Sequence, residues 1–262
     1  MSRVVAISNQ KGGVGKTTTA VNLAASLAVA EQRVLLVDVD PQGNASSGVG
    51  VSERSLERSL YPVLFREATI ADMAVQTELP FLRVVPACRD LAGVEIELVD
   101  APDRALRLRD ALAPVRDDYD FIFVDCPPSL GILTVNALVA ADVVLVPMQA
   151  EYYALEGLSD LVSTIERVRS TLNPTLEIHG VLLTMFDPRN NLSTQVAEEV
   201  RKHFRVFETV IPRNVRLAEA PSHGRPVILY DAASRGSHQY LSLAREILDY
   251  RALPEPQPQA QA

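Results

Sequence analysis

Short runs of hydrophobic residues alternate along the chain with longer segments whose hydrophobic positions repeat at helical spacing. The short runs are rich in Val, Ile and Leu, which is typical of strands buried on both faces of a parallel sheet. We therefore expect an α/β fold, a doubly wound and mostly parallel sheet with helices on both faces. The expected strands are Val4–Ser8, Val34–Asp40, Leu82–Ala87, Phe121–Pro127, Val143–Pro147 and Gly180–Phe186, with a weaker one at Phe207–Pro212. The expected helices are Thr17–Ala30, Ala105–Val115, Leu130–Ala140, Leu155–Leu172, Leu192–Phe204 and Ser237–Tyr250.

The length and composition fit one globular domain with a well-buried core. The chain has 262 residues, 47% of them hydrophobic, and we place a single domain at residues 1–253. Residues 254–262 are rich in Pro, Gln and Ala, which predicts a disordered tail. The stretch Val51–Ile70 carries mixed signals and is expected to be irregular or helical.

Hydrophobic stretches, cysteines and net charge limit the classes of function. The run Val4–Ile7 is too short for a signal peptide, and the longest run, Ala137–Met148, is too short to span a bilayer. Cys88 and Cys126 lie far apart and have no metal-ligand spacing, which favours a reducing cytoplasm. The net charge is −8, so binding to nucleic acid or anionic lipid would need a local basic patch.

The stretch KGGVGKTTTA follows one expected strand and begins an expected helix. In that context glycines let backbone N–H groups converge on an anion, and the helix N-terminus adds its dipole. We expect Lys16 to bind the β- and γ-phosphates, the Thr17 hydroxyl to bind Mg²⁺, and Thr18 to bind the α-phosphate. The usual phosphate-loop pattern begins with Gly where this chain has Gln10, and the alternative is a plain Gly-rich turn. The predicted nucleotide-binding loop comprises Lys11, Gly12, Gly13, Val14, Gly15, Lys16, Thr17 and Thr18.

The second lysine of this loop needs a separate explanation. The chain has three lysines, Lys11, Lys16 and Lys202, and two of them lie in this one loop. Lys11 adds a cation where the helix N-terminus is already positive, so it does not stabilise the turn. It is either a solvated surface residue or a cation for the phosphates of a nucleotide held by a second subunit, as an arginine finger is.

Four stretches together resemble the ParA/MinD superfamily, and the resemblance covers residues 2–250. KGGVGKTT resembles its deviant Walker A motif, with Lys11 as the signature lysine. LLVDVDPQGNAS (Leu35–Ser46) and FIFVDCPPSLG (Phe121–Gly131) are similar to the second acidic motif and to the Walker B and switch II region. VIPRNVRLAEAPSHGRPV (Val210–Val227) is similar to a C-terminal stretch of the chromosomal ParA/Soj branch.

This resemblance implies a P-loop ATPase of ParA type that serves chromosome or plasmid segregation. It implies ATP and Mg²⁺ as cofactors and a sandwich homodimer when ATP is bound. It also implies non-specific binding of double-stranded DNA and a ParB/Spo0J-type partner that stimulates hydrolysis and release. The expected location is cytoplasmic and nucleoid-associated, with no membrane partner.

Three aspartates end expected strands and would point into the crevice where open α/β sheets bind ligands. The resemblance assigns Asp40 to orienting or deprotonating the attacking water, so the predicted catalytic residues are Asp40, Lys16 and Lys11. Asp125 is expected to hold Mg²⁺ through water and Asp38 to support the same metal, together with Thr17. The alternative is that these aspartates only cap turns or helices.

The C-terminal third of the chain contains candidate residues for contact with the adenine base and for contact with DNA. By resemblance, Pro212 and Asn214 contact the adenine base, although a simple turn after a strand also explains them. Between Arg189 and Arg216 the chain has six basic and three acidic residues, against a net charge of −8 overall. This local excess predicts a face for sequence-independent contact with DNA phosphates, although helix capping also explains part of it. The predicted DNA-binding residues are Arg189, Arg201, Lys202, Arg213 and Arg216.

Two other classes of function remain as alternatives. A MinD-like division protein would bind the membrane through a basic amphipathic helix, and the C-terminal residues here contain few basic residues. A metabolic relative would be a nitrogenase-reductase-like electron donor or an ATP-dependent amide or biotin-pathway ligase. The donor needs paired cluster cysteines, and the ligase needs a substrate pocket that the sequence does not identify.

Overall fold

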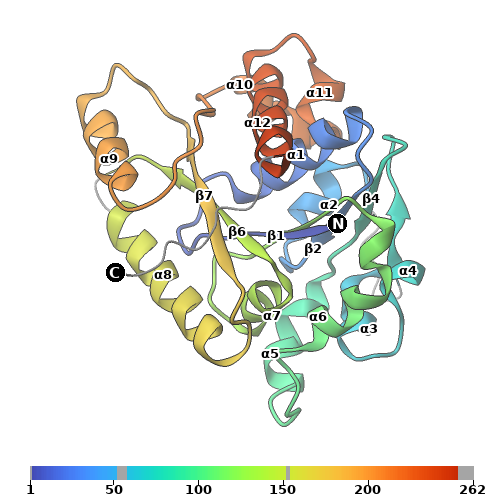
Figure 1. Ribbon diagram of the computed structural model, residues 1–262. Helices are drawn as coiled ribbons and strands as arrows, with labels where there is room; N and C mark the ends of the chain where they lie inside the picture. Colours follow the sequence, from blue (N-terminus) through green and yellow to red (C-terminus); the bar gives the residue numbers. More distant parts are fainter. Residues whose placement is uncertain (1, 52–57, 152–153, 253–262) are drawn as a thin grey trace.

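The computed structural model describes residues 2–51, 58–151 and 154–252, which build one sheet between two layers of helices (Figure 1). Within these residues seven strands lie in the order β3-β4-β2-β5-β1-β6-β7. β3 pairs antiparallel with β4, and the other pairs of neighbouring strands are parallel. The predicted doubly wound, mostly parallel sheet is therefore confirmed. The strands are β1 Arg3–Ile7, β2 Val34–Asp38, β3 Val75–Gln76, β4 Leu82–Val85, β5 Phe121–Asp125, β6 Val143–Gln149 and β7 Glu177–Thr184.

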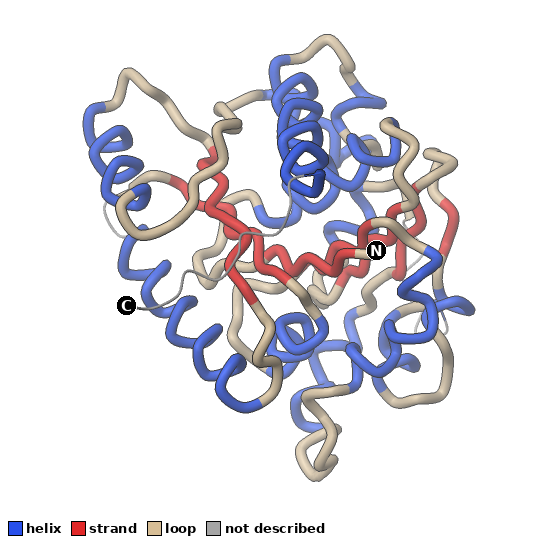
Figure 2. The backbone as a smooth tube through the Cα atoms, in the orientation of Figure 1, coloured by secondary structure: helices blue, strands red, loops and turns tan. Residues whose placement is uncertain are grey.

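Helices cover both faces of the sheet, as the tube drawing in Figure 2 makes plain. One layer packs on the first hydrophobic cluster and contains α3 Leu60–Leu64, α4 Ile70–Met73, α5 Val94–Glu97, α6 Arg107–Leu112, α7 Ile132–Ala140, α8 Ala154–Thr171 and α9 Asn191–Arg201. The other packs on the second cluster and contains α1 Lys16–Val29, α2 Asn44–Gly48, α10 Val215–Glu219, α11 Val227–Tyr230 and α12 Arg235–Ala252. Short 3₁₀ turns lie at Arg89–Gly93, Ala113–Asp118 and Ala220–His223.

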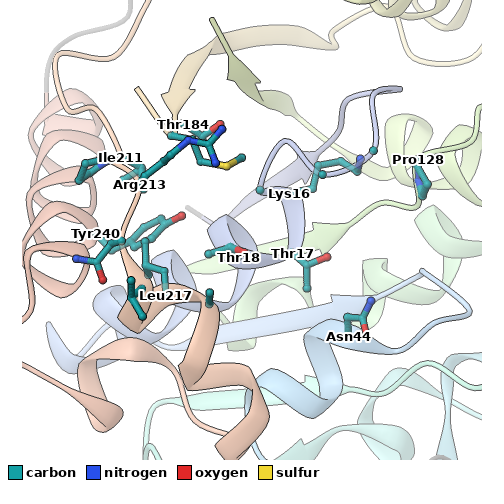
Figure 3. A pocket seen from close by; sticks show the side chains of 18 of the residues that line it. Lys16, Thr17, Thr18, Asn44, Pro128, Thr184, Ile211, Arg213, Leu217 and Tyr240 are labelled. Carbon is teal, nitrogen blue, oxygen red and sulfur yellow. The ribbon is translucent and has the colours of Figure 1, made fainter. Parts of the chain in front are cut away.

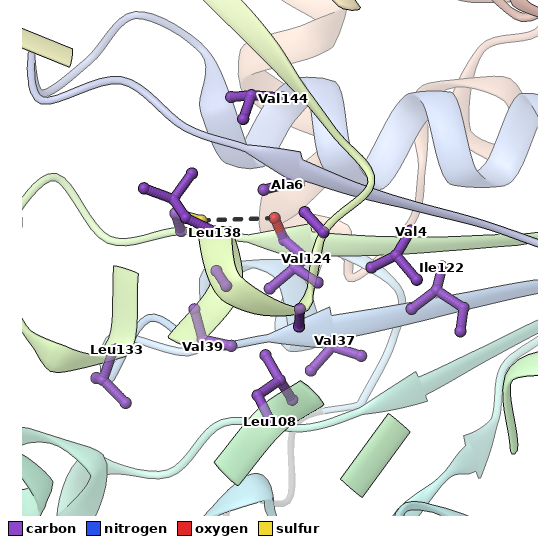
Figure 4. Packing of buried hydrophobic residues seen from close by; sticks show 14 of the residues in the cluster. Val4, Ala6, Val37, Val39, Leu108, Ile122, Val124, Leu133, Leu138 and Val144 are labelled. Atoms are coloured by element: carbon purple, nitrogen blue, oxygen red, sulfur yellow. Dashed lines mark hydrogen bonds between the residues drawn. The ribbon is translucent and has the colours of Figure 1, made fainter. Parts of the chain in front are cut away.

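Alternating side chains of the central strand join the sheet to both layers. Val4 and Ala6 of β1 belong to the first cluster, whereas Val5 and Ile7 belong to the second. Figure 4 shows Val4 and Ala6 beside strand residues of β2 and β5, with helix residues such as Leu138 packed against them. Because both faces are covered, the central strands β1, β2 and β5 each contain four consecutive hydrophobic residues, which is why they appear as continuous runs in the sequence.

One expected strand did not form. Among the described residues, isolated bridges to β7 are made by Val206, just before the segment Phe207–Pro212, and by Ile211 within it, and the segment is not a regular strand. The backbone N–H groups of Glu208 and Thr209 donate to the Glu246 carboxylate of α12 at 2.9 and 3.0 Å. A side chain therefore takes hydrogen bonds that a continuous β ladder would need, and the prediction of a strand was wrong.

Other expectations fall partly outside the described residues. In Val51–Ile70, which we expected to be irregular or helical, residues 52–57 lie outside them, and α3 occupies part of the remainder. The tail predicted at residues 254–262 also lies outside them. The expected helix Ala105–Val115 is α6 followed by a 3₁₀ turn that begins where Pro114 follows Ala113. Proline lacks the N–H that would continue the α-helical ladder, so the change of helix type has a local cause.

A histidine in β7 makes the fold sensitive to acid. His179 is 6% exposed, and its ring lies edge-on to Phe207. Burial, together with the charges of Arg3 and Arg205, lowers the pKa of His179 to about 3. Between this value and its ordinary pKa near 6.5, the unfolded chain binds a proton that the folded chain does not.

We therefore expect the free energy of unfolding to fall as the pH falls below about 6.5, by roughly 1–2 kcal/mol between pH 7 and pH 5. His179→Gln should remove this part of the pH dependence, because glutamine does not titrate. Urea unfolding at several pH values measures it, with His203→Gln, at an exposed position, as the control. Equal pH slopes for wild type and His179→Gln would contradict the assignment.

Candidate active site

The loop between β1 and α1 is built to bring backbone N–H groups together. Gly13 and Gly15 have φ values of 75° and 85°, a left-handed conformation that residues with a side chain adopt at a cost. Asn9 accepts a hydrogen bond from the Lys11 backbone N–H at 3.0 Å. From the other side of the loop, the Thr184 hydroxyl of β7 donates to the Val14 carbonyl at 2.8 Å. The loop is thus held in place by one polar contact within itself and one with β7.

This loop forms one wall of a cavity of about 730 Å³. Figure 3 shows Lys16, Thr17 and Thr18 on one side of it and Ile211, Arg213 and Leu217 on another. Of the predicted site residues, those that line the cavity are Gly12, Gly13, Gly15, Lys16, Thr17, Thr18, Asp40, Pro212, Asn214 and Arg213. The lining also contains residues that the sequence did not single out for nucleotide binding, among them Gln42, Thr184, Met185 and Tyr240.

Strand register brings the acidic residues to the phosphate loop. Asp125 at the end of β5 is level with Ile7 of β1 on one side and with Asp38 of β2 on the other. Lys16, the first residue of α1, is 7% exposed and lies close enough to Asp125 and Asp40 to interact with both carboxylates. Burial lowers the pKa of Lys16, and the charge of Asp125 partly offsets this shift. The Lys16 ammonium donates to the Lys11 carbonyl at 3.0 Å.

Asp38 and Asp40 differ in how their carboxylates are used. Asp38 is fully buried, and its Oδ2 accepts from the backbone N–H and the hydroxyl of Ser46 at 2.8 and 2.7 Å. Burial raises the pKa of Asp38 to about 6, although the Ser46 hydrogen bonds act in the opposite direction. Asp40 is 8% exposed, lines the cavity and accepts from the Gln42 N–H at 2.9 Å. Asp38 therefore anchors the loop after β2, while Asp40 faces the space where a ligand would lie.

Asp125 provides the test of whether the site suits a metal ion. It is fully buried, and its burial together with the charge of Asp38 raises its pKa well above the ordinary value. The Thr17 hydroxyl is near enough to lower this pKa, yet neither carboxylate oxygen receives a well-formed hydrogen bond. A buried carboxylate with unused acceptors beside other acids and a threonine hydroxyl fits a divalent cation such as Mg²⁺.

The cavity wall opposite the phosphate loop is mainly apolar. Ile211, Leu217 and Tyr240 contribute to it, and the Tyr240 hydroxyl is within hydrogen-bond distance of Thr19 Oγ1 at 3.2 Å. Pro212 and Asn214 also line the cavity. The Asn214 side chain accepts from the Arg216 N–H at 2.9 Å and so caps α10. Asn214 can therefore cap α10 and also contact a flat apolar ligand in the cavity.

Lys11 lies apart from the cavity. It is not among the described residues that line it, and its ammonium pairs with Glu151 Oε2 at 2.6 Å. The two side chains are 36% and 49% exposed. The two lysines of the loop thus have different surroundings, since Lys16 is buried at the cavity and Lys11 is on the surface.

The cations predicted to form a DNA-binding face differ in their surroundings. Arg213 lines the cavity. Arg189 pairs with Asp187 at 2.8 Å, Lys202 with Glu199 at 2.6 Å, and Arg216 with Glu219 at 2.9 Å. Arg201 lies in the last turn of α9. The cations are exposed, but three of them are paired with neighbouring carboxylates.

Comparison with known proteins decides the family. A family model described as an AAA domain matches residues 2–178. The chain is 58% identical to the chromosome partitioning protein ParA of Myxococcus xanthus over 95% of this chain and 88% of that protein. It is 57% identical to the sporulation initiation inhibitor protein Soj of Bacillus subtilis over 94% and 98% of the two chains. This chain belongs to the ParA/Soj family.

Solved structures share the fold of this ParA/Soj-family chain. Cobyrinic acid a,c-diamide synthase from Mycobacterium smegmatis, with a bound ATP analogue and magnesium, is 35% identical and gives a TM-score of 0.86 over all of both chains. The cell division ATPase MinD of Pyrococcus furiosus is 26% identical, with a TM-score of 0.80 over 95% of this chain and 100% of that one.

Two features are absent from the described residues. No helix there combines the length and the apolar character that crossing a bilayer requires. In the same part of the chain, no group of three or more His, Cys, Asp or Glu side chains is arranged to hold a metal by itself.

Lys16→Ala should weaken nucleotide binding by roughly 10- to 150-fold, the range for losing hydrogen bonds from a charged donor. Without the Lys16 ammonium, less positive charge remains to balance the carboxylates of Asp38, Asp40 and Asp125 near the phosphates. Isothermal titration with ATP measures the change. Arg245→Ala on α12, whose side chain is 85% exposed, removes a cation elsewhere and should bind like wild type. Wild-type affinity in Lys16→Ala would contradict the role of this lysine.

Proposed function

We propose that this ParA/Soj-family protein is an ATP hydrolase that drives the segregation of DNA. In this proposal two ATP-bound subunits form a sandwich dimer that binds double-stranded DNA without sequence preference. A ParB/Spo0J-type partner then stimulates hydrolysis and release. The observation that carries the proposal is the separation of the two loop lysines, one buried at the cavity and one paired on the surface.

The residues around the cavity suit a nucleoside triphosphate with Mg²⁺. The backbone N–H groups near Gly13 and Gly15 and the Lys16 ammonium would bind the phosphates, and the apolar wall with Pro212 would receive the base. Thr17 and Asp125 would hold Mg²⁺, which when bound neutralises charge on the phosphate oxygens. The solved structures of the Mycobacterium smegmatis synthase with an ATP analogue or ADP and magnesium support this assignment.

Asp40 is the residue that we propose for positioning the attacking water. It lies at the edge of the cavity, and its Oδ1 is fixed by the Gln42 N–H at 2.9 Å. Asp38 and Asp125 are fully buried, so they are less able to reach a water at the γ-phosphate. An acceptor held next to the reacting phosphate orients the water for in-line attack.

We further propose that Lys11 acts on the nucleotide of the other subunit. Its side chain pairs with Glu151, is not among the described residues that line its own cavity and is partly exposed, so a neighbouring molecule could reach it. A cation that arrives from a second subunit would stabilise the negative charge of the triphosphate. Dimerisation and ATP binding would then depend on each other.

Lys11→Ala should bind ATP like wild type but remain monomeric, because Lys16 and the backbone cradle are intact while the trans cation is missing. Sedimentation with a non-hydrolysable ATP analogue tests this. Arg33→Ala is a suitable control, because it removes an arginine that is 52% exposed and pairs with Asp120 away from the phosphate loop. A normal dimer formed by Lys11→Ala would refute the trans assignment.

The DNA-binding face is proposed for the exposed cations of the C-terminal third. In Figure 1, α9 is at the upper left, beside the β7 edge of the sheet, and α10 is at the top, although the two helices belong to opposite layers. The pairs of Arg189, Lys202 and Arg216 with carboxylates are exposed, and exposed pairs contribute only about 0–1 kcal/mol. DNA phosphates could therefore compete for these cations, and a dimer would present two such faces to one duplex.

Arg189→Glu should weaken binding to every DNA sequence alike, because the arginine binds phosphate and not a base. Each dimer loses two phosphate-binding cations, one from each subunit, so the slope of log K against log salt should flatten by about 1.8. Binding to two unrelated duplexes at several salt concentrations measures both effects. Arg33→Glu makes the same charge reversal at another aspartate-paired arginine and should keep the wild-type slope. Loss of binding to one duplex alone would show base recognition and contradict the proposal.

The alternatives have weaker support. Identity to MinD of Pyrococcus furiosus is 26%, against 57–58% for the partitioning relatives. The cobyrinic acid a,c-diamide synthase is named for a reaction that forms amides, and its identity of 35% is also well below that of the partitioning relatives. Pelleting of the protein with DNA and with anionic liposomes, each with and without ATP, distinguishes partition from membrane binding.

A further inference from the structure

Glu151 holds the side chain of Lys11 at a well-defined place. Glu151 lies between β6 and α8, 140 residues from Lys11, and its Oε2 receives the Lys11 ammonium at 2.6 Å. Its own backbone is fixed, because its N–H donates to the Gln149 carbonyl and its carbonyl accepts from Ala154, both at 2.9 Å. The backbone that presents the carboxylate is therefore held by hydrogen bonds at both its N–H and its carbonyl.

The second carboxylate oxygen connects this pair to the cavity. With the Gln149 amide oriented to satisfy both of its neighbours, its nitrogen donates to Glu151 Oε1 at 3.3 Å. Its oxygen then accepts from Arg213 Nη2 at 3.0 Å. Arg213 lines the cavity, so a chain of polar contacts runs from the cavity wall through Gln149 and Glu151 to Lys11.

The backbone of Lys11 is tied to the same subunit as well. Its N–H donates to Asn9, and its carbonyl accepts from the Lys16 ammonium, both at 3.0 Å. A phosphate in the cradle would compete with this carbonyl for Lys16. The Glu151 carboxylate would then be the main remaining contact that keeps the Lys11 side chain in its own subunit.

We propose that Glu151 is a positioning residue that holds Lys11 within its own subunit. When the dimer forms, the ion pair breaks and the Lys11 ammonium binds the phosphates of the partner's nucleotide instead. This inference rests on the proposed trans role of Lys11. Charge and exposure support the exchange: one carboxylate carries a single negative charge, whereas a triphosphate carries several. An ion pair this exposed is also weak enough to be replaced.

The strength of the pair sets the size of the effect. An exposed ion pair typically shifts an equilibrium by about 1.4- to 5-fold, and a dimer would break two of them. Glu151→Gln keeps the size of the side chain but removes its charge. It should therefore tighten analogue-dependent dimerisation by roughly two- to thirty-fold, whereas the nucleotide affinity of the monomer should not change.

Sedimentation at a series of protein concentrations with a non-hydrolysable ATP analogue measures the dimer dissociation constant. Removal of an acidic charge from each subunit could by itself favour dimerisation of a chain with net charge −8. Glu156→Gln is the matched control, because Glu156 is exposed in the first turn of α8 and makes the same change of charge. A dimer of Glu151→Gln no tighter than that of Glu156→Gln, or weaker than that of wild type, would overturn the proposal.

A second measurement tests the pair in the monomer and does not depend on the trans role. The chain has three lysines, so acetylation by an amine-reactive reagent can be followed at Lys11 with Lys202 as the internal reference. Glu151→Gln should raise the labelling rate of Lys11 relative to Lys202 by up to about 5-fold, and Glu156→Gln should not. If the relative labelling rate of Lys11 were the same in Glu151→Gln and in wild type, the proposal that Glu151 holds Lys11 would be overturned. A raised rate together with a normal dimer of Lys11→Ala would refute the trans role alone.

Discussion

The arrangement of the site depends on one electrostatic constraint at the carboxyl edge of the sheet. Parallel register brings Asp125 level with Asp38, and both carboxylates are fully buried. Burial and the charge of Asp38 raise the pKa of Asp125, and the Thr17 hydroxyl and the Lys16 charge offset this shift only in part. Ser46 donates twice to Asp38, while Lys16 supplies a positive charge nearby. The phosphate loop, the loop after β2 and the end of β5 are thus linked by electrostatic interactions of opposite charges. A divalent cation would neutralise the negative charge that remains.

The two hydrophobic layers make this concentration of charge possible. A sheet covered on both faces leaves its strand ends as the place where polar groups gather, because β1 and β5 are otherwise lined by residues such as Val5, Ile122 and Phe123. Thr184 and Tyr240 then extend polar contacts from β7 and α12 to the loop and to α1. Elements far apart in the sequence therefore fix the position of the phosphate loop, and packing on both faces keeps that position from drifting.

The sequence was most informative where local pattern and chemistry coincide. Buried strands have a continuous hydrophobic pattern, and the Gly-Lys-Thr turn has a recognisable spacing, so the fold and the loop around Lys16 could be predicted. Contacts between distant residues could not. The partnership of Glu151 with Lys11 spans 140 residues, and the carboxylate of Glu246 replaces a strand partner of the segment 207–212. Arg213 appeared as one more basic residue in a basic stretch, and only the folded chain places it at the cavity.

The different burial of the two loop lysines suits them to different tasks. Lys16 is buried among carboxylates, where solvent screens charge least, so its position is strongly determined and its ammonium is a permanent part of the cavity. Lys11 is exposed and paired with a single carboxylate, so its position is weakly determined and can change at little cost in free energy. A residue that must bind the subunit's own nucleotide benefits from the first arrangement. On the proposed trans role, Lys11 would leave its subunit to reach another and would benefit from the second, and the two lysines lie five positions apart in one loop.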